Sequence, residues 1–189
     1  MYMSRVQTTQ QINYILRQIG KEGLSGVTLP ADSMAHVLEC IAQVPHELSV
    51  KFVTELRRQQ LVEISRADGI FTVQLSVKGI HRLQRAEIGE LTIATPSAWD
   101  GHWRMVIFDL PRTHAQQRYV LTSQLRRLGF VMLRDSTWLH PYPCFDVVDS
   151  IVRYCGVVRA ITTAEVTSLD ASSVRTLQRA FPELTARKE

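Results

Sequence analysis

The sequence lacks any apolar run approaching the roughly 18 residues that a membrane helix needs, and its first residues carry no apolar signal core. Its three cysteines, Cys40, Cys144 and Cys155, form no Cys-x-x-Cys pair, so neither a disulfide framework nor a zinc knuckle is expected. The sequence also has no Gly-rich phosphate loop, and its six histidines show no metal-ligand spacing. We therefore expect a cytoplasmic protein that has no membrane contact and no cofactor.

Lysine is scarce as well. Only four of the 22 basic residues are lysine (Lys21, Lys51, Lys78 and Lys188), and all the others are arginine. Arginine suits phosphates and guanine edges because its planar fork donates two parallel hydrogen bonds, although a genome of high GC content also enriches arginine. The formal net charge is only +4, so composition leaves nucleic-acid binding open without establishing it.

The 189 residues divide into two halves with different patterns. Residues 1–90 have mainly helical periodicity and one short hairpin, whereas residues 103–189 alternate between strand and helix patterns. Residues 91–102 between them contain Pro96, Gly101 and small polar residues, which is typical of a linker. The sequence therefore predicts an α+β protein with two domains, 1–90 and 103–189.

Three helices followed by a hairpin are expected in the first half, because apolar residues recur there at helical spacings and then at strand spacings. The expected elements are a helix over 6–20, a second helix capped by Asp32, a third helix after Pro45, strands over 61–65 and 70–75, and a further helix that starts after Ser76 and runs through Gly89. Asp68-Gly69 between the two strands is a strong hairpin signal.

This order of elements is that of a winged helix-turn-helix. In such a module the third helix presents a polar face to the major groove of DNA, while its apolar face packs on the other helices. Leu48, Phe52 and Leu56 are the apolar positions of that helix. The expected DNA contacts are the polar positions between them and the basic residue of the hairpin: Ser49, Lys51, Thr54, Arg57, Arg58 and Arg66. Some winged helices bind protein instead, so a protein-interaction module remains an alternative.

The second half has the order of a ferredoxin-like βαββαβ domain. The expected elements are a strand over 105–108, a helix capped by Thr113, strands over 130–133 and 137–141, a helix over 145–155, a strand over 157–162 and a last helix capped by Asp170. A four-stranded sheet of this kind leaves a face or an edge to bury, so we expect the domain to form a homodimer.

Several motifs of this half resemble the PaaX-type transcriptional repressors, which join an N-terminal winged helix to a ferredoxin-like domain through a Trp-x-Gly-x-Trp motif. The resemblance is carried by Trp99-Asp-Gly-His-Trp-Arg-Met-Val-Ile-Phe-Asp-Leu-Pro111, by Leu125-Arg-Arg-Leu-Gly-Phe130 and by Ser136-Thr-Trp-Leu139. It implies a homodimeric repressor that binds double-stranded DNA, with a small-molecule effector of unknown identity as a further partner.

The second half is also similar to the CRISPR-associated endonuclease of the second Cas family. That family places an aspartate at the end of its first strand, which Asp109 matches here. The resemblance implies that two such aspartates, one from each protomer, hold a Mg²⁺ ion for cleavage, and Mg²⁺ favours carboxylate oxygen ligands. A metal-dependent nuclease or a CRISPR-adaptation-like subunit that uses Asp109 is therefore the enzymatic alternative.

From these observations we expect a DNA-binding transcriptional regulator. A symmetric dimer carries two recognition helices, so its operator is expected to be an inverted repeat with half-sites about one helical turn apart.

Overall fold

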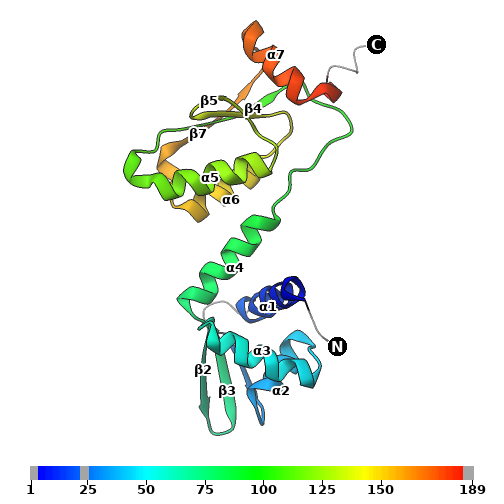
Figure 1. Cartoon of the computed structure of the whole chain (residues 1–189), viewed down its shortest axis with the longest axis vertical. Coiled ribbons are helices and arrows are strands. Elements are labelled where there is room, and N and C mark those ends of the chain that lie inside the picture. Colours follow the sequence, from blue (N-terminus) through cyan, green and yellow to red (C-terminus); the bar gives the residue numbers. More distant parts are fainter. Residues whose placement is uncertain (1–3, 22–25, 185–189) are drawn as a thin grey trace. The chain divides into compact units, whose positions relative to one another are not determined.

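The computed structural model describes residues 4–21 and 26–184, and the chain divides into two compact units, Met1–Glu87 and Ile88–Glu189 (Figure 1). Each unit combines helices with an antiparallel sheet and has an apolar core of its own. The prediction of an α+β protein is therefore confirmed.

The first unit contains a three-stranded antiparallel sheet in the order β1-β3-β2. In chain order its elements are α1 (Arg5–Gly20), β1 (Val27–Pro30), α2 (Met34–Ala42), α3 (His46–Arg58), β2 (Val62–Ala67), β3 (Ile70–Leu75) and α4 (Val77–Glu90), whose last residues belong to the second unit. The predicted helices and the hairpin are confirmed. Asp68 and Gly69 at the tip of the hairpin both have positive φ, as a two-residue turn of type I′ requires.

Two features of this unit differ from the prediction. Ser33, not Asp32, caps α2, because the Ser33 side chain accepts a hydrogen bond from the backbone N–H of His36. Strand β1 was not predicted. It has four residues and ends in a proline, so it carries little local signal, and pairing with β3 from Val27↔Val73 to Pro30↔Ile70 defines it.

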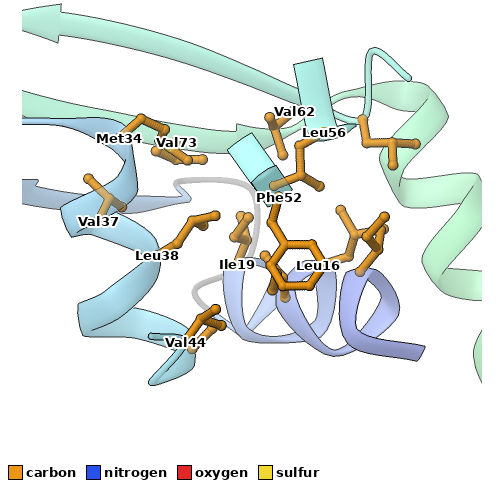
Figure 2. Close-up of a cluster of buried hydrophobic side chains, with 14 of the residues drawn as sticks. Leu16, Ile19, Met34, Val37, Leu38, Val44, Phe52, Leu56, Val62 and Val73 are labelled. Atoms are coloured by element: carbon orange, nitrogen blue, oxygen red, sulfur yellow. The ribbon is translucent and has the colours of Figure 1, made fainter. Parts of the chain in front are cut away.

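Apolar side chains from the first three helices and the sheet meet in one core (Figure 2). Phe52 and Leu56 of α3 point into this cluster, where they meet Leu16 and Ile19 of α1 and Leu38 of α2. All five side chains are buried. One side of α3 is therefore fixed in the core, and its opposite side is left at the surface.

The second unit contains a four-stranded antiparallel sheet in the order β5-β6-β4-β7. Its elements are β4 (Trp103–Phe108), α5 (Ala115–Arg127), β5 (Val131–Arg134), β6 (Thr137–His140), α6 (Phe145–Cys155), β7 (Ile161–Val166) and α7 (Ala171–Ala180), with short 3₁₀ turns before α5, before β7 and after α7. The βαββαβ order and this strand order are those of a ferredoxin-like domain.

Two boundaries in this unit correct the prediction. The last strand is β7 over 161–166 rather than 157–162, because Val157 enters the core just before a 3₁₀ turn over 158–160. Thr113 does not cap α5: it lies in the preceding 3₁₀ turn, and α5 starts without a side-chain cap. Asp170 caps α7 as predicted, since its carboxylate accepts from the backbone N–H groups of Ser172 and Ser173.

The two faces of this sheet are covered differently. Helices α5 and α6 lie on one face, and α7 lies on the other (Figure 1). Val106, Phe108 and Trp138 belong to the cluster under α5 and α6, whereas Trp103 and Leu139 pack with Leu177 of α7. This alternation follows from the period of two along a strand.

A tight turn precedes β4 at the Trp-x-Gly-x-Trp motif. The indole N–H of Trp99 donates to the carbonyl of His102, and the Trp99 and Trp103 rings lie 4.9 Å apart. Gly101 has φ +81°, a conformation that L side chains rarely adopt. The motif therefore packs the end of the 91–102 segment on the second unit.

The arginine that follows this turn is held by an ion pair. Arg104 is buried, and its guanidinium donates to both carboxylate oxygens of Asp100 at 2.8 and 2.5 Å and to the carbonyls of His102 and Pro141. Glu165 of β7 lies 3.4 Å from the same group. The hydrogen bond from Arg104 holds the pKa of the Asp100 carboxyl well below its ordinary value. A buried charge needs partners. The pair between Asp100 and Arg104 therefore holds the turn that precedes β4 in place.

In the part of the chain that the structure describes, no helix has the length and apolar character that crossing a membrane requires.

We expect Gly79→Ala to lower the free energy of unfolding by about 1–3 kcal/mol through overpacking. A Cβ at Gly79 would overlap the carbonyl oxygen of Leu61, at the point where α4 begins. Gly89→Ala in the same helix is the matched control, because a Cβ there meets no atom within 4 Å. An exposed helical glycine replaced by alanine should gain up to about 1 kcal/mol. Urea unfolding followed by circular dichroism measures the free energy of unfolding of both variants. Equal changes in the two variants would contradict the close contact between Gly79 and the Leu61 carbonyl.

We expect Asp100→Asn to lower the free energy of unfolding at pH 7 by about 1–3 kcal/mol, because the buried Arg104 loses the carboxylate that accepts two of its hydrogen bonds. The pKa of Asp100 is lowered by folding, so its stabilisation is present at neutral pH and is lost as the pH falls below about 4. The difference between wild type and variant should therefore shrink in acid. Asp149→Asn, which breaks the exposed pair with Arg153, is the control and should have little effect. A constant difference from neutral to acid pH would be incompatible with this ion pair.

Candidate nucleic-acid interface

Helix α3 is defined by signals at both ends. Pro45 occupies the cap position, Glu47 lies in the first turn, and Arg57 and Arg58 lie in the last turn. These charges complement the helix dipole, which is positive at the N-terminus and negative at the C-terminus. Proline cannot continue the preceding helix, and it sets the start of the new one. The sequence therefore fixes where α3 begins and ends.

The surface side of α3 carries most of the predicted DNA contacts. Lys51, Thr54, Arg57 and Arg58 are all exposed. They lie opposite Phe52 and Leu56, which the core buries. The four polar residues therefore share one accessible helix face.

Ser49 is a correction to the predicted set. Its side chain is fully buried, and its hydroxyl donates to the carbonyls of Val44 and Pro45 at 3.1 and 3.2 Å. This hydrogen bonding ties the first turn of α3 to the chain that precedes it. A residue in this position stabilises the helix start and does not reach a ligand outside.

Arg58 is already paired within its own helix. Its guanidinium donates to the two carboxylate oxygens of Glu55 at 2.8 and 2.6 Å. The hydrogen bonds from Arg58 and from Gln59 lower the pKa of the Glu55 carboxyl to about 2. Gln59 in turn accepts from Arg82 of α4. The spacing of three between Glu55 and Arg58 is visible in the sequence and signals such a pair, but it did not enter the prediction.

Lys51 and Arg57 differ from Arg58 in this respect. Within the described residues, neither side chain takes part in an ion pair or a hydrogen bond with an acidic group. Their charges are therefore available to an anionic ligand, whereas part of the charge of Arg58 is compensated by Glu55. These two cations are the strongest candidates for contact with phosphate.

The β2–β3 hairpin holds the remaining predicted contact. Arg66 is exposed, and its guanidinium lies 5.1 Å from the centre of the Phe71 ring on the neighbouring strand. The two residues face each other in the antiparallel register. This cation–π contact orients the side chain while leaving its donors accessible.

Several arginines of the second unit make structural contacts. Arg126 lies over the ring of Trp138 at 5.3 Å. Arg127 donates to the carbonyls of Ile88 and Leu91, which closes the end of α4. Arg118 donates to the carbonyl of Leu110. These contacts account for Arg118, Arg126 and Arg127 without a nucleic-acid ligand.

Asp109, the candidate of the nuclease alternative, is exposed directly after β4, and its backbone N–H donates to the carbonyl of Ala160. Across residues 4–21 and 26–184, no group of three or more His, Cys, Asp or Glu side chains lies together as a metal site would require. Asp109 supplies one carboxylate per chain at this position. A Mg²⁺ site here would therefore need a second copy of the chain.

Two other titratable groups of this unit are buried in apolar surroundings. Burial raises the pKa of the Cys144 thiol to about 12, and it lowers the pKa of His140. A thiol of this kind is not a nucleophile at neutral pH. His140 packs between the rings of Phe130 and Tyr142, which gives it a structural role.

One residue of the α3 surface was missed by the sequence analysis. Val50 precedes Lys51 and is half exposed, although valine is an apolar residue. The sequence analysis considered only the polar residues of this face.

Comparison with known proteins identifies the second unit. No curated protein matches the chain. Residues 96–178 match the family model described as the PaaX protein central Cas2-like domain. The match begins shortly before the Trp-x-Gly-x-Trp turn and ends within α7, so it covers the whole four-stranded sheet. The chain therefore contains a domain similar to the central Cas2-like domain of PaaX proteins.

Proposed function

We propose that the chain is a DNA-binding transcriptional regulator of PaaX-like type, in which the first unit is a winged helix and α3 enters the major groove. The order α1-β1-α2-α3-β2-β3 and the three-stranded sheet support this reading. The observation that carries it is the single accessible face of α3 with Lys51 and Arg57, whose charges no described acidic group pairs. The β2–β3 hairpin with Arg66 then serves as the wing.

The family match supports the same function, because PaaX proteins are in general transcriptional regulators. We propose that the second unit makes the protein a homodimer. Ile107 is exposed on the face of the sheet that carries α7, and its register partners Thr137 and Thr162 are small. We propose that a second copy of the chain covers this exposed residue. The operator is then an inverted repeat with half-sites about 34 Å apart.

The test of this function is fluorescence anisotropy of a labelled duplex, selected from a random-sequence pool, titrated with the full chain in EDTA and in Mg²⁺. A regulator should bind intact DNA in EDTA with an affinity that falls steeply with salt. Sedimentation of the free protein should give twice the 21.5 kDa of one chain. Cutting of the duplex that requires Mg²⁺ and disappears in Asp109→Ala would favour the nuclease instead. A dimer that binds no duplex at low salt would favour a protein-interaction module.

We expect Arg57→Ala to weaken binding to all duplexes and to reduce the slope of log affinity against log salt by about one. The reason is that an unpaired cation in the last turn of α3 contacts phosphate, which carries no sequence information. Arg179→Ala is the control, because it removes the same charge from an exposed site in the other unit. If Arg57→Ala leaves both the affinity and the salt slope unchanged, α3 does not contact the DNA backbone as proposed.

A further inference from the structure

Val50 gives the α3 face an apolar element among its charges. The side chain is 50% exposed, on the fifth residue of the helix. Lys51 follows it directly, and Thr54 lies one turn further on. Val50 therefore belongs to the accessible side of α3 and contributes little to the core.

The neighbouring Thr54 has its hydroxyl turned toward the helix. Its Oγ1 donates to the carbonyl of Val50 at 3.0 Å. The hydroxyl hydrogen is thereby used within the helix, and the methyl group of Thr54 remains for contact with a ligand. Two methyl-bearing side chains thus lie four residues apart on one face, with Lys51 and Arg57 beside them.

An exposed valine on a protein surface is by itself ordinary. In a helix, however, a β-branched residue is a poorer choice than alanine at an exposed position, because it loses rotamer freedom. Because Val50 is half exposed, burial in the core does not compensate fully for this loss of side-chain entropy. Its place in the first half of α3 matters more, since the N-terminal part of a recognition helix is the part that contacts base edges.

The major groove offers one apolar group on its base edges, the C5 methyl of thymine. We propose that Val50 contacts this methyl group, so that the chain selects duplexes with thymine at the corresponding position of each half-site. The proposal rests on the proposed function, in which α3 is the recognition helix. Lys51 and Arg57 supply the attraction to phosphate that brings the methyl groups of Val50 and Thr54 into the groove.

Deoxyuridine in place of thymidine tests the proposal, because it removes only this methyl group. A duplex selected by the full chain from a random-sequence pool is resynthesised with one thymidine at a time replaced by deoxyuridine. At the contacted position the affinity of the wild type should fall about fourfold, which is the expected effect of losing one buried methyl contact. In Val50→Ala the same replacement should have no effect.

Val158→Ala is the matched control, since Val158 is 52% exposed in the other unit. This variant should keep the full sensitivity to deoxyuridine. If the wild type binds the selected duplex but tolerates deoxyuridine at every position, the contact with thymine is overturned, while the proposed function as a DNA-binding regulator still holds. Sensitivity that persists unchanged in Val50→Ala would overturn the assignment to Val50. If no duplex is bound at all, the proposed function fails together with this inference.

Discussion

The burial of one side of α3 is the interaction on which the proposed interface depends. Phe52 and Leu56 fill the space between α1 and α2, and Ser49 fastens the first turn through its hydroxyl. Because a helix has only one side to bury here, Lys51, Thr54 and Arg57 come together on the other side. Loss of this packing would remove the surface as a unit, because the position of all three residues depends on α3.

The second unit depends on a different constraint, the buried guanidinium of Arg104. Its pairing with Asp100 requires the tight turn at Gly101, and the same turn brings Trp99 against Trp103. The residues of the Trp-x-Gly-x-Trp motif are thus explained by folding, not by ligand binding. The arginines of α5 are likewise tied to Trp138 and to the end of α4. Lys51 and Arg57 of α3 are exposed and make no such contact within the described residues, which agrees with the role that we propose for the first unit.

The sequence predicted most of the elements because their periodicities are local. Helices α1, α3 and α6 and the Asp68-Gly69 hairpin follow from spacing and turn residues. Strand β1 did not, since only its pairing with β3 defines it. The shift of the last strand to 161–166 has a similar cause, because Val157 is buried by a turn and not by a strand. At the candidate site, the spacing of the sequence predicted helix α3 and its polar positions. It could not show that Ser49 is buried, that Glu55 compensates Arg58, or that Val50 is exposed.

Lysine acetylation followed by mass spectrometry tests the central claim most directly, because the chain has only four lysines and Lys51 alone lies on α3. The full chain is acetylated with and without a bound duplex. The account predicts that DNA protects Lys51 from modification, while Lys21 at the end of α1 remains reactive as the internal reference. Full reactivity of Lys51 in the presence of a bound duplex would contradict the placement of α3 in the groove.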